Sequence, residues 1–450
     1  MPQSFQCAMV RRLSGRVIGC LALTAALASA TAAIQSPQLD KTERERAKQM
    51  LEDIERSVRD NYYDKTFRGI DLAAHFEAAR GKIDTAVSVG HAYAVIAQAL
   101  IDFDDSHLYF IPPPRPSTYE YGWHMQMIGE ECLVVAVRPG SDAAGKGLKP
   151  GDRVLRYEAF TPSRRDLWKA RYLYQVLSPR ATLNLVVQSP GASPRTLSIA
   201  AKVTPGRQVI EIGIENILEG GRIFDDEQPL VERHRYGRVG DVAVWKLTGF
   251  DFDASDVDRV VDEIVKGASS IVIDMRGNGG GSVKTLEQVT RRLFDRDVKI
   301  ADLKGRKSMK PLLAKKRKSP FEGKVVVLVD AESGSAAEVL ARVVQLEKRG
   351  TVIGDRSSGS VMQSRPIMAS VDTVDGFIPY GVSVTDADII MADGKSLEHA
   401  GVVPDELLLP TPADLAAGRD AVLARALALL GAPLDPHVAG KMFPVEWKQK

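Results

Sequence analysis

Two serines in the segment AESGSAAEVL (331–340) have a setting that suits a hydrolytic nucleophile. Ser333 and Ser335 follow the apolar run KVVVLVD, which predicts a buried strand, and precede a stretch with helical spacing. A serine at such a corner lies at the positive end of a helix, where backbone N–H groups can stabilise an oxyanion. This segment also matches a helix capping box, because Glu338 follows Ser335 by three residues. The ten residues contain no histidine, lysine or cysteine, so a base must come from elsewhere.

A second corner lies in DMRGNGGGS (274–282), between the apolar run SSIVID and the helical stretch VKTLEQVTRRLF. Glycine-rich corners often bind phosphate, but both nucleotide patterns fail here. The dinucleotide pattern counted from Gly277 needs glycine where Ser282 stands, and the phosphate-loop pattern needs glycine where Val283 stands. The N–H groups of this turn suit an oxyanion better. A tight turn alone explains one or two glycines, but explains three in a row poorly.

The sequence gives little support to metal catalysis. Its seven histidines include no HExxH pair, and histidines and cysteines do not cluster at ligand spacing. We therefore expect neither a metal nor another cofactor.

The predicted secondary structure that must position the two corners differs between three regions of the chain. Residues 39–103 have helical periodicity, and PPPRP (112–116) ends this region. A β-rich stretch follows over 118–203. From Gly240 onward strands alternate with helices, which favours an α/β layer with a mostly parallel sheet. The closing segment DLAAGRDAVLARALALL (414–430) predicts an amphipathic helix.

The first 33 residues have the pattern of a secretory signal peptide, with three arginines before a small and apolar run. We therefore expect an exported protein, periplasmic or secreted, without a stable membrane span. Cys20 loosely resembles a lipoprotein anchor site, but the apolar run continues past it. Without the leader's arginines, 57 Lys+Arg remain against 58 Asp+Glu, so net charge gives no support to nucleic-acid binding.

The β-rich stretch resembles a PDZ domain in the segments PGSDAA (139–144) and GLKPGD (147–152). The resemblance implies an open sheet edge that captures an extended polypeptide, often by its C-terminus, as an added strand. A β-domain without a ligand is the alternative.

The segments DMRGNGGG, VLVDAESGSAAEV and VIGDRSSGS together resemble the tail-specific (C-terminal processing) proteases and the tricorn protease core. This resemblance covers nearly all of 39–430. It implies that Ser335, and not Ser333, is the nucleophile. It also implies that the N–H groups of Gly280 or Gly281 and of Ala336 hold the oxyanion.

The two branches of this family differ in the base that they use. The tail-specific branch has a lysine after the glycine of the downstream turn, and here Ser360 follows Gly359. The tricorn-like branch has a histidine preceded by a serine and a glutamate late in the chain. That pattern implies His107 as base, oriented by Ser106 and Glu398, while His399 is a rival base and His124 a possible ligand contact.

The expected architecture is a multi-domain α/β protein. We divide it into a signal peptide (1–33), an N-terminal helical region (34–117), a PDZ-like domain (118–205), a peptidase domain (206–432) and a C-terminal tail (433–450). The expected function is exported serine endopeptidase action on extended or unfolded polypeptides through a Ser/His/Ser/Glu tetrad. The alternative is a catalytically silent ligand- or peptide-binding protein on the same scaffold. The sequence leaves the oligomeric state open.

Overall fold

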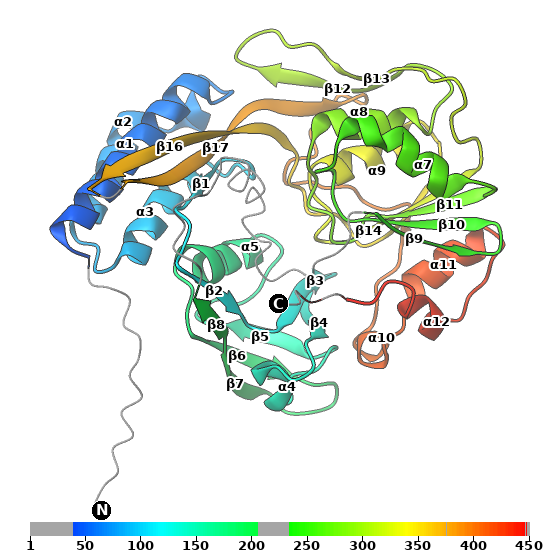
Figure 1. Ribbon diagram of the computed structural model, residues 1–450, viewed down its shortest axis with the longest axis horizontal. Helices are drawn as coiled ribbons and strands as arrows, with labels where there is room; N and C mark the ends of the chain where they lie inside the picture. Colours follow the sequence, from blue (N-terminus) through cyan, green and yellow to red (C-terminus); the bar gives the residue numbers. More distant parts are fainter. Residues whose placement is uncertain (1–38, 206–233, 375, 446, 448–450) are drawn as a thin grey trace, which may run out of the picture. The chain divides into compact units, whose positions relative to one another are not determined.

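The computed structural model describes residues 39–205, 234–374, 376–445 and 447 (Figure 1). These residues belong to one compact unit. The predicted signal peptide and the expected start of the peptidase domain, 206–233, lie outside them. In the described residues, no helix is long and apolar enough to cross a membrane.

Three α-helices form the N-terminal region: α1 (Lys41–Asn61), α2 (Leu72–Asp84) and α3 (Val89–Ile101), with the short 3-10 turn η1 (Phe67–Gly69). Each α-helix begins at a residue whose side chain accepts a backbone N–H, namely Asp40, Asp71 and Ser88. Their apolar faces share one core, to which the predicted α3 face contributes Ile96 and Leu100.

The helices pack against a long antiparallel hairpin that the sequence did not predict. Its strands are β16 (Met362–Thr373) and β17 (Gly376–Met391), and β17 adds Tyr380, Val382 and Val384 to the helical core. The short strand β1 (Tyr109–Ile111) pairs with β17, whose other end pairs with β12 (Val298–Gly305). Strand β13 (Leu312–Ala314) completes this sheet. The N-terminal helices and β1 are thereby tied to segments much later in the chain.

The β-rich region is a five-stranded antiparallel sheet of order β3-β4-β5-β6-β7. Its elements are β3 (Trp123–Ile128), β4 (Glu131–Val137), α4 (Asp142–Gly145), β5 (Arg153–Tyr157), α5 (Leu167–Arg171), the π-helical turn η2 (Tyr172–Leu177), β6 (Thr182–Gln188) and β7 (Arg195–Ala200). Strands β2 (Ser117–Glu120) and β8 (Lys202–Pro205) pair beside it. The predicted Gly-Asp turn has a steric role, because a Cβ on Gly151 would lie 2.3 Å from the carbonyl oxygen of Pro412.

The third region contains a six-stranded, mostly parallel sheet of order β18-β15-β14-β11-β10-β9, in which only the β9–β10 pair is antiparallel. Its strands are β9 (His234–Val239), β10 (Val242–Leu247), β11 (Ser270–Asp274), β14 (Lys324–Val329), β15 (Thr351–Gly354) and β18 (Glu406–Leu407). With the helices and the antiparallel sheets, it confirms the predicted multi-domain α/β fold class; the domain boundaries stay predictions.

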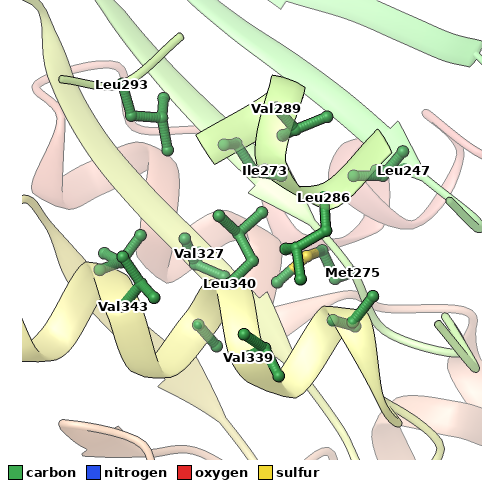
Figure 2. Packing of buried hydrophobic residues seen from close by; sticks show 14 of the residues in the cluster. Leu247, Ile273, Met275, Leu286, Val289, Leu293, Val327, Val339, Leu340 and Val343 are labelled. Atoms are coloured by element: carbon green, nitrogen blue, oxygen red, sulfur yellow. The ribbon is translucent and has the colours of Figure 1, made fainter. Parts of the chain in front are cut away.

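Helices cover both faces of this sheet. One face packs against α7 (Val257–Val265, preceded by η3, Ala254–Asp256), α8 (Val283–Arg291) and α9 (Ala336–Leu346). Figure 2 shows Leu286 of α8 and Leu340 of α9 meeting Val327 of β14 in this layer. The other face packs against α11 (Ala421–Leu429) and α12 (Pro436–Gly440), which follow α10 (Pro412–Ala417). Because β11 and β14 are parallel neighbours, the two corners that follow them lie at the same edge of the sheet.

Candidate active site

Ser335 lies where the chain turns from β14 into α9. Its backbone has φ +50° and ψ −119°, a region that costs a non-glycine residue about 1–3 kcal/mol. Two acceptors hold the residue by its N–H group: the carbonyl of Ser360 at 2.9 Å and Oε2 of Glu338 at 3.1 Å. The N–H of Gly334 donates to the carbonyl of Asn278 at 2.9 Å, which joins this corner to the glycine turn.

Ser333 lies in the same corner but is fully buried. Its Oγ donates to the carbonyl of Met275 at 2.8 Å and accepts the N–H of Asp330 at 2.9 Å. A hydroxyl committed to these backbone groups is unable to attack a substrate. Of the two serines that the sequence offered, the geometry therefore favours Ser335.

His107 is the histidine that faces Ser335. Its Nε2 lies 3.2 Å from Oγ of Ser335, and its Nδ1 lies 2.8 Å from Oγ of Ser106. The Ser106 hydroxyl donates its single proton to Oε2 of Glu398 at 2.8 Å, so it can only accept from the imidazole. This pattern assigns the proton to Nδ1 and leaves Nε2 free to accept the proton of Ser335.

Glu398 anchors this chain of contacts. Its side chain is 6% exposed, and it also accepts the N–H groups of Ser106 at 2.9 Å and Val361 at 2.8 Å. The structure thus brings together four residues that the sequence placed in one site: Ser335, His107, Ser106 and Glu398.

The rival histidines lie elsewhere. His399 has a half-exposed side chain, and its Nε2 lies 2.9 Å from the carbonyl oxygen of Asp104. His124 lies on β3, where its ring stacks against Trp447. Neither ring takes the position beside Ser335 that His107 occupies.

Burial lowers the pKa of His107 below its ordinary value, and the charges of Glu398 and Asp105 oppose the shift. The carboxylate of Asp105 is itself buried and accepts three hydrogen bonds: from the N–H of His107 at 3.0 Å, the Thr385 hydroxyl at 2.7 Å and the Tyr62 hydroxyl at 2.9 Å. Asp105 therefore fixes the backbone of the histidine to α1 and β17. This role was not predictable from the sequence, because Tyr62 and Thr385 reach Asp105 only in the folded chain.

The expected oxyanion donors differ in whether their N–H group already donates to an acceptor within the protein. The N–H of Gly280 donates to Oδ1 of Asn278 at 2.9 Å, so the structure does not leave it open for an oxyanion. Asn278 is fully buried, and its amide also donates to the carbonyl of Leu247 at 2.9 Å. The N–H of Ala336 belongs to the first turn of α9 and has no acceptor inside the helix. The geometry therefore favours Ala336 over Gly280 as an oxyanion donor.

Gly280 has a different, steric role. Its φ is +105°, and a Cβ placed on it would lie 2.5 Å from Cβ of Ser335 and 3.0 Å from the backbone nitrogen of Ala336. Only glycine lets the turn approach the serine this closely.

Glu338 links the serine corner to the downstream turn in which the sequence lacks a lysine. Its buried carboxylate accepts from the Ser357 hydroxyl at 2.6 Å and from the N–H groups of Gly359 at 2.7 Å and Ser360 at 2.9 Å, besides that of Ser335. Burial raises the pKa of Glu338 to about 7, although these four donors favour the ionised form. The sequence signal for this residue was the capping box; its contacts with the turn were not predictable from it.

Known proteins that are similar to this chain include peptidases. Residues 241–408 match the model of Peptidase family S41. The chain is 26% identical over 380 residues to the chloroplastic C-terminal processing peptidase of Tetradesmus obliquus, covering 80% of this chain and 77% of that protein. It is also 26% identical over 351 residues to the carboxy-terminal processing protease CtpB of Bacillus subtilis (strain 168), covering 75% and 64%.

The crystal structure of mature CPAF has a similar fold, with a TM-score of 0.61 and 14% sequence identity over 84% of this chain and 95% of that one. The matched segment contains the glycine turn, Ser335 and Glu398, and its sheet supplies both corners of the site. On these grounds the segment 241–408 is similar to peptidase family S41, a family of serine peptidases, which are hydrolases.

Proposed function

We propose that this protein is an exported endopeptidase that hydrolyses peptide bonds in extended or unfolded polypeptides, with Ser335, His107, Ser106 and Glu398 as its catalytic tetrad. The observation that carries the proposal is the 3.2 Å contact between Nε2 of His107 and Oγ of Ser335, in the tautomer that a general base requires.

In this mechanism, Oγ of Ser335 attacks the scissile carbonyl while its proton passes to Nε2 of His107. Ser106 and Glu398 stabilise the imidazolium through Nδ1–H. The N–H groups of Gly281 and Ala336 hold the oxyanion. His107 then protonates the leaving amine, and water hydrolyses the acyl-enzyme with His107 again as base.

Two further parts of the proposal come from the sequence. The leader pattern of residues 1–33 supports export to the periplasm or the medium. The PDZ-like segments, which lie in the connection between β4 and β5, support capture of substrate C-termini at the sheet β3–β7.

The test is labelling of the mature chain with a fluorophosphonate probe, followed by hydrolysis of an unfolded polypeptide such as β-casein. We expect both reactions in the wild type and in Ser358→Ala, a control in which an exposed serine near the site is changed. Ser335→Ala should show neither. Labelling that persists in Ser335→Ala would refute the assignment, and a wild type that neither labels nor cleaves would favour a catalytically silent binding protein.

A further inference from the structure

Strand β3 is an open edge of its sheet. It stands first in the order β3-β4-β5-β6-β7, and in the described part of the chain it pairs with β4 alone. An exposed strand edge offers unpaired N–H and C=O groups to any extended polypeptide. A bulge between His124 and Met125 shifts the register of the pairing with β4, which begins at Trp123.

The chain's own C-terminal segment is anchored on the six-stranded sheet of the peptidase region. After α12, Met442 and Phe443 pack against the core beneath α11. Arg235 of β9 donates through Nη1 to the carbonyl of Pro444 at 3.0 Å, and its guanidinium lies 5.5 Å from the ring of Phe443. These contacts hold the segment as far as Pro444.

Three residues later the same segment reaches β3. The indole of Trp447 stacks on the imidazole of His124, with ring centroids 4.8 Å apart and ring planes 9° from parallel. The indole is partly buried although it lies close to the end of the chain. The imidazole of His124, on β3, covers one face of this large apolar ring.

We propose that the C-terminal segment is an intramolecular occupant of β3, with Trp447 as its anchor on His124, and that an extended polypeptide joining the sheet at this strand has to displace it. The consequence for catalysis rests on the proposed function, in which this edge captures substrate. The occupancy itself does not depend on peptidase activity.

Occupancy is tested in the Ser335→Ala protein, where self-cleavage does not interfere. Hydrogen exchange of the amides in Trp123–Ile128 is compared between this parent and its Trp447→Ala derivative, with Phe377→Ala as a control that removes an exposed aromatic from the β16–β17 hairpin. We expect at least about tenfold faster exchange in the Trp447→Ala protein and no change in the control. Equal exchange in all three would overturn the proposal.

A second arm uses a Ser335→Ala chain that ends at Pro444 and a fluorescent peptide of sequence KMFPVEWKQK. We expect saturable binding to the shortened chain, at least about tenfold weaker binding to the full-length chain, and at least about tenfold weaker binding of the peptide with alanine for tryptophan. His124→Ala in the shortened chain should weaken binding similarly. Equal binding by the full-length and shortened chains would refute the occupancy.

Activity assays separate this proposal from the proposed function. With β-casein as substrate, Trp447→Ala should lower KM at least about threefold with kcat unchanged. If the wild type cleaves β-casein but hydrogen exchange and peptide binding do not change when Trp447 is removed, the occupancy is wrong and the peptidase assignment stands. If exchange and binding respond but nothing is cleaved, the proposed function is wrong and the occupancy stands.

Discussion

Oγ of Ser106 donates a hydrogen bond of 2.8 Å to Oε2 of Glu398, a residue 292 positions later in the sequence. This bond consumes the only proton of the hydroxyl, so the other contact of Ser106, with Nδ1 of His107, must run from the imidazole to the serine. Ser106 thus links the carboxylate of Glu398 to the base, His107, by two hydrogen bonds and does not itself bond to the nucleophile, Ser335. Five predictions concern this site.

Replacing Ser106 should slow the chemical step without weakening substrate binding. In Ser106→Ala, Nδ1 loses its acceptor, so the tautomer is no longer fixed and the imidazolium is no longer stabilised. We expect kcat to fall about 10²–10³-fold with KM changed less than about threefold. Steady-state kinetics on an unfolded polypeptide measures this split. A rise in KM at constant kcat would show that Ser106 acts on binding instead.

The sequence offers two histidines as the base, His107 and His399, and alanine variants distinguish them. His107→Ala should lower kcat about 10⁴-fold, because the variant loses the imidazole that lies 3.2 Å from Oγ of Ser335. His399→Ala should keep activity within about threefold, since its half-exposed ring lies beside Asp104 and 3.7 Å from Oε1 of Glu398 and does not take the place of His107 beside Ser335. The opposite ranking would make His399 the base.

The glycine turn offers a matched pair of variants. Gly280→Ala would place a methyl group 2.5 Å from Cβ of Ser335 at a φ of +105°, whereas a methyl group on Gly279 meets nothing within 4 Å. We expect Gly280→Ala to lose at least about 10²-fold in kcat/KM, the scale of one oxyanion donor, and Gly279→Ala to lose less than about threefold. Comparable losses in both variants would contradict the steric role of Gly280.

The sequence predicted some of these features well because they carry local or motif-level signals. The apolar face of α7 and the buried strand β11 follow from periodicity, and Ser335, His107 and Glu398 came from a combination of motifs. The β16–β17 hairpin was missed because its residues alternate weakly between buried and exposed positions. Asp105 and Asn278 carry no local signal, since their roles depend on partners far away in the chain. The choice between Gly280 and Gly281 depends on which N–H Asn278 accepts, which only the fold decides.

The pH dependence of kcat/KM should reflect the burial of His107. General-base catalysis requires neutral imidazole, and burial lowers the pKa of His107, so the base remains neutral at lower pH than an exposed histidine would. We therefore expect the acid limb of kcat/KM to lie below pH 6.5. A limb centred near pH 7 would contradict this and point to ionisation of Glu338 as the controlling step.

Glu338 should make the free energy of unfolding depend on pH. Its pKa is raised from 4.5 to about 7 in the folded chain, so the folded state binds this proton more tightly than the unfolded state does. The resulting stabilisation is fully present below pH 4.5 and is lost as the pH rises through 7, with a total of about 3 kcal/mol. Between pH 4.5 and 8, the Ser335→Ala protein should therefore lose about 3 kcal/mol more than the same protein with Glu338→Gln, measured by urea unfolding. Every other titrating group, His107 included, is common to both proteins. If the free energies of unfolding of the two proteins change in parallel with pH, the four donors around Glu338 keep its carboxylate ionised throughout this range.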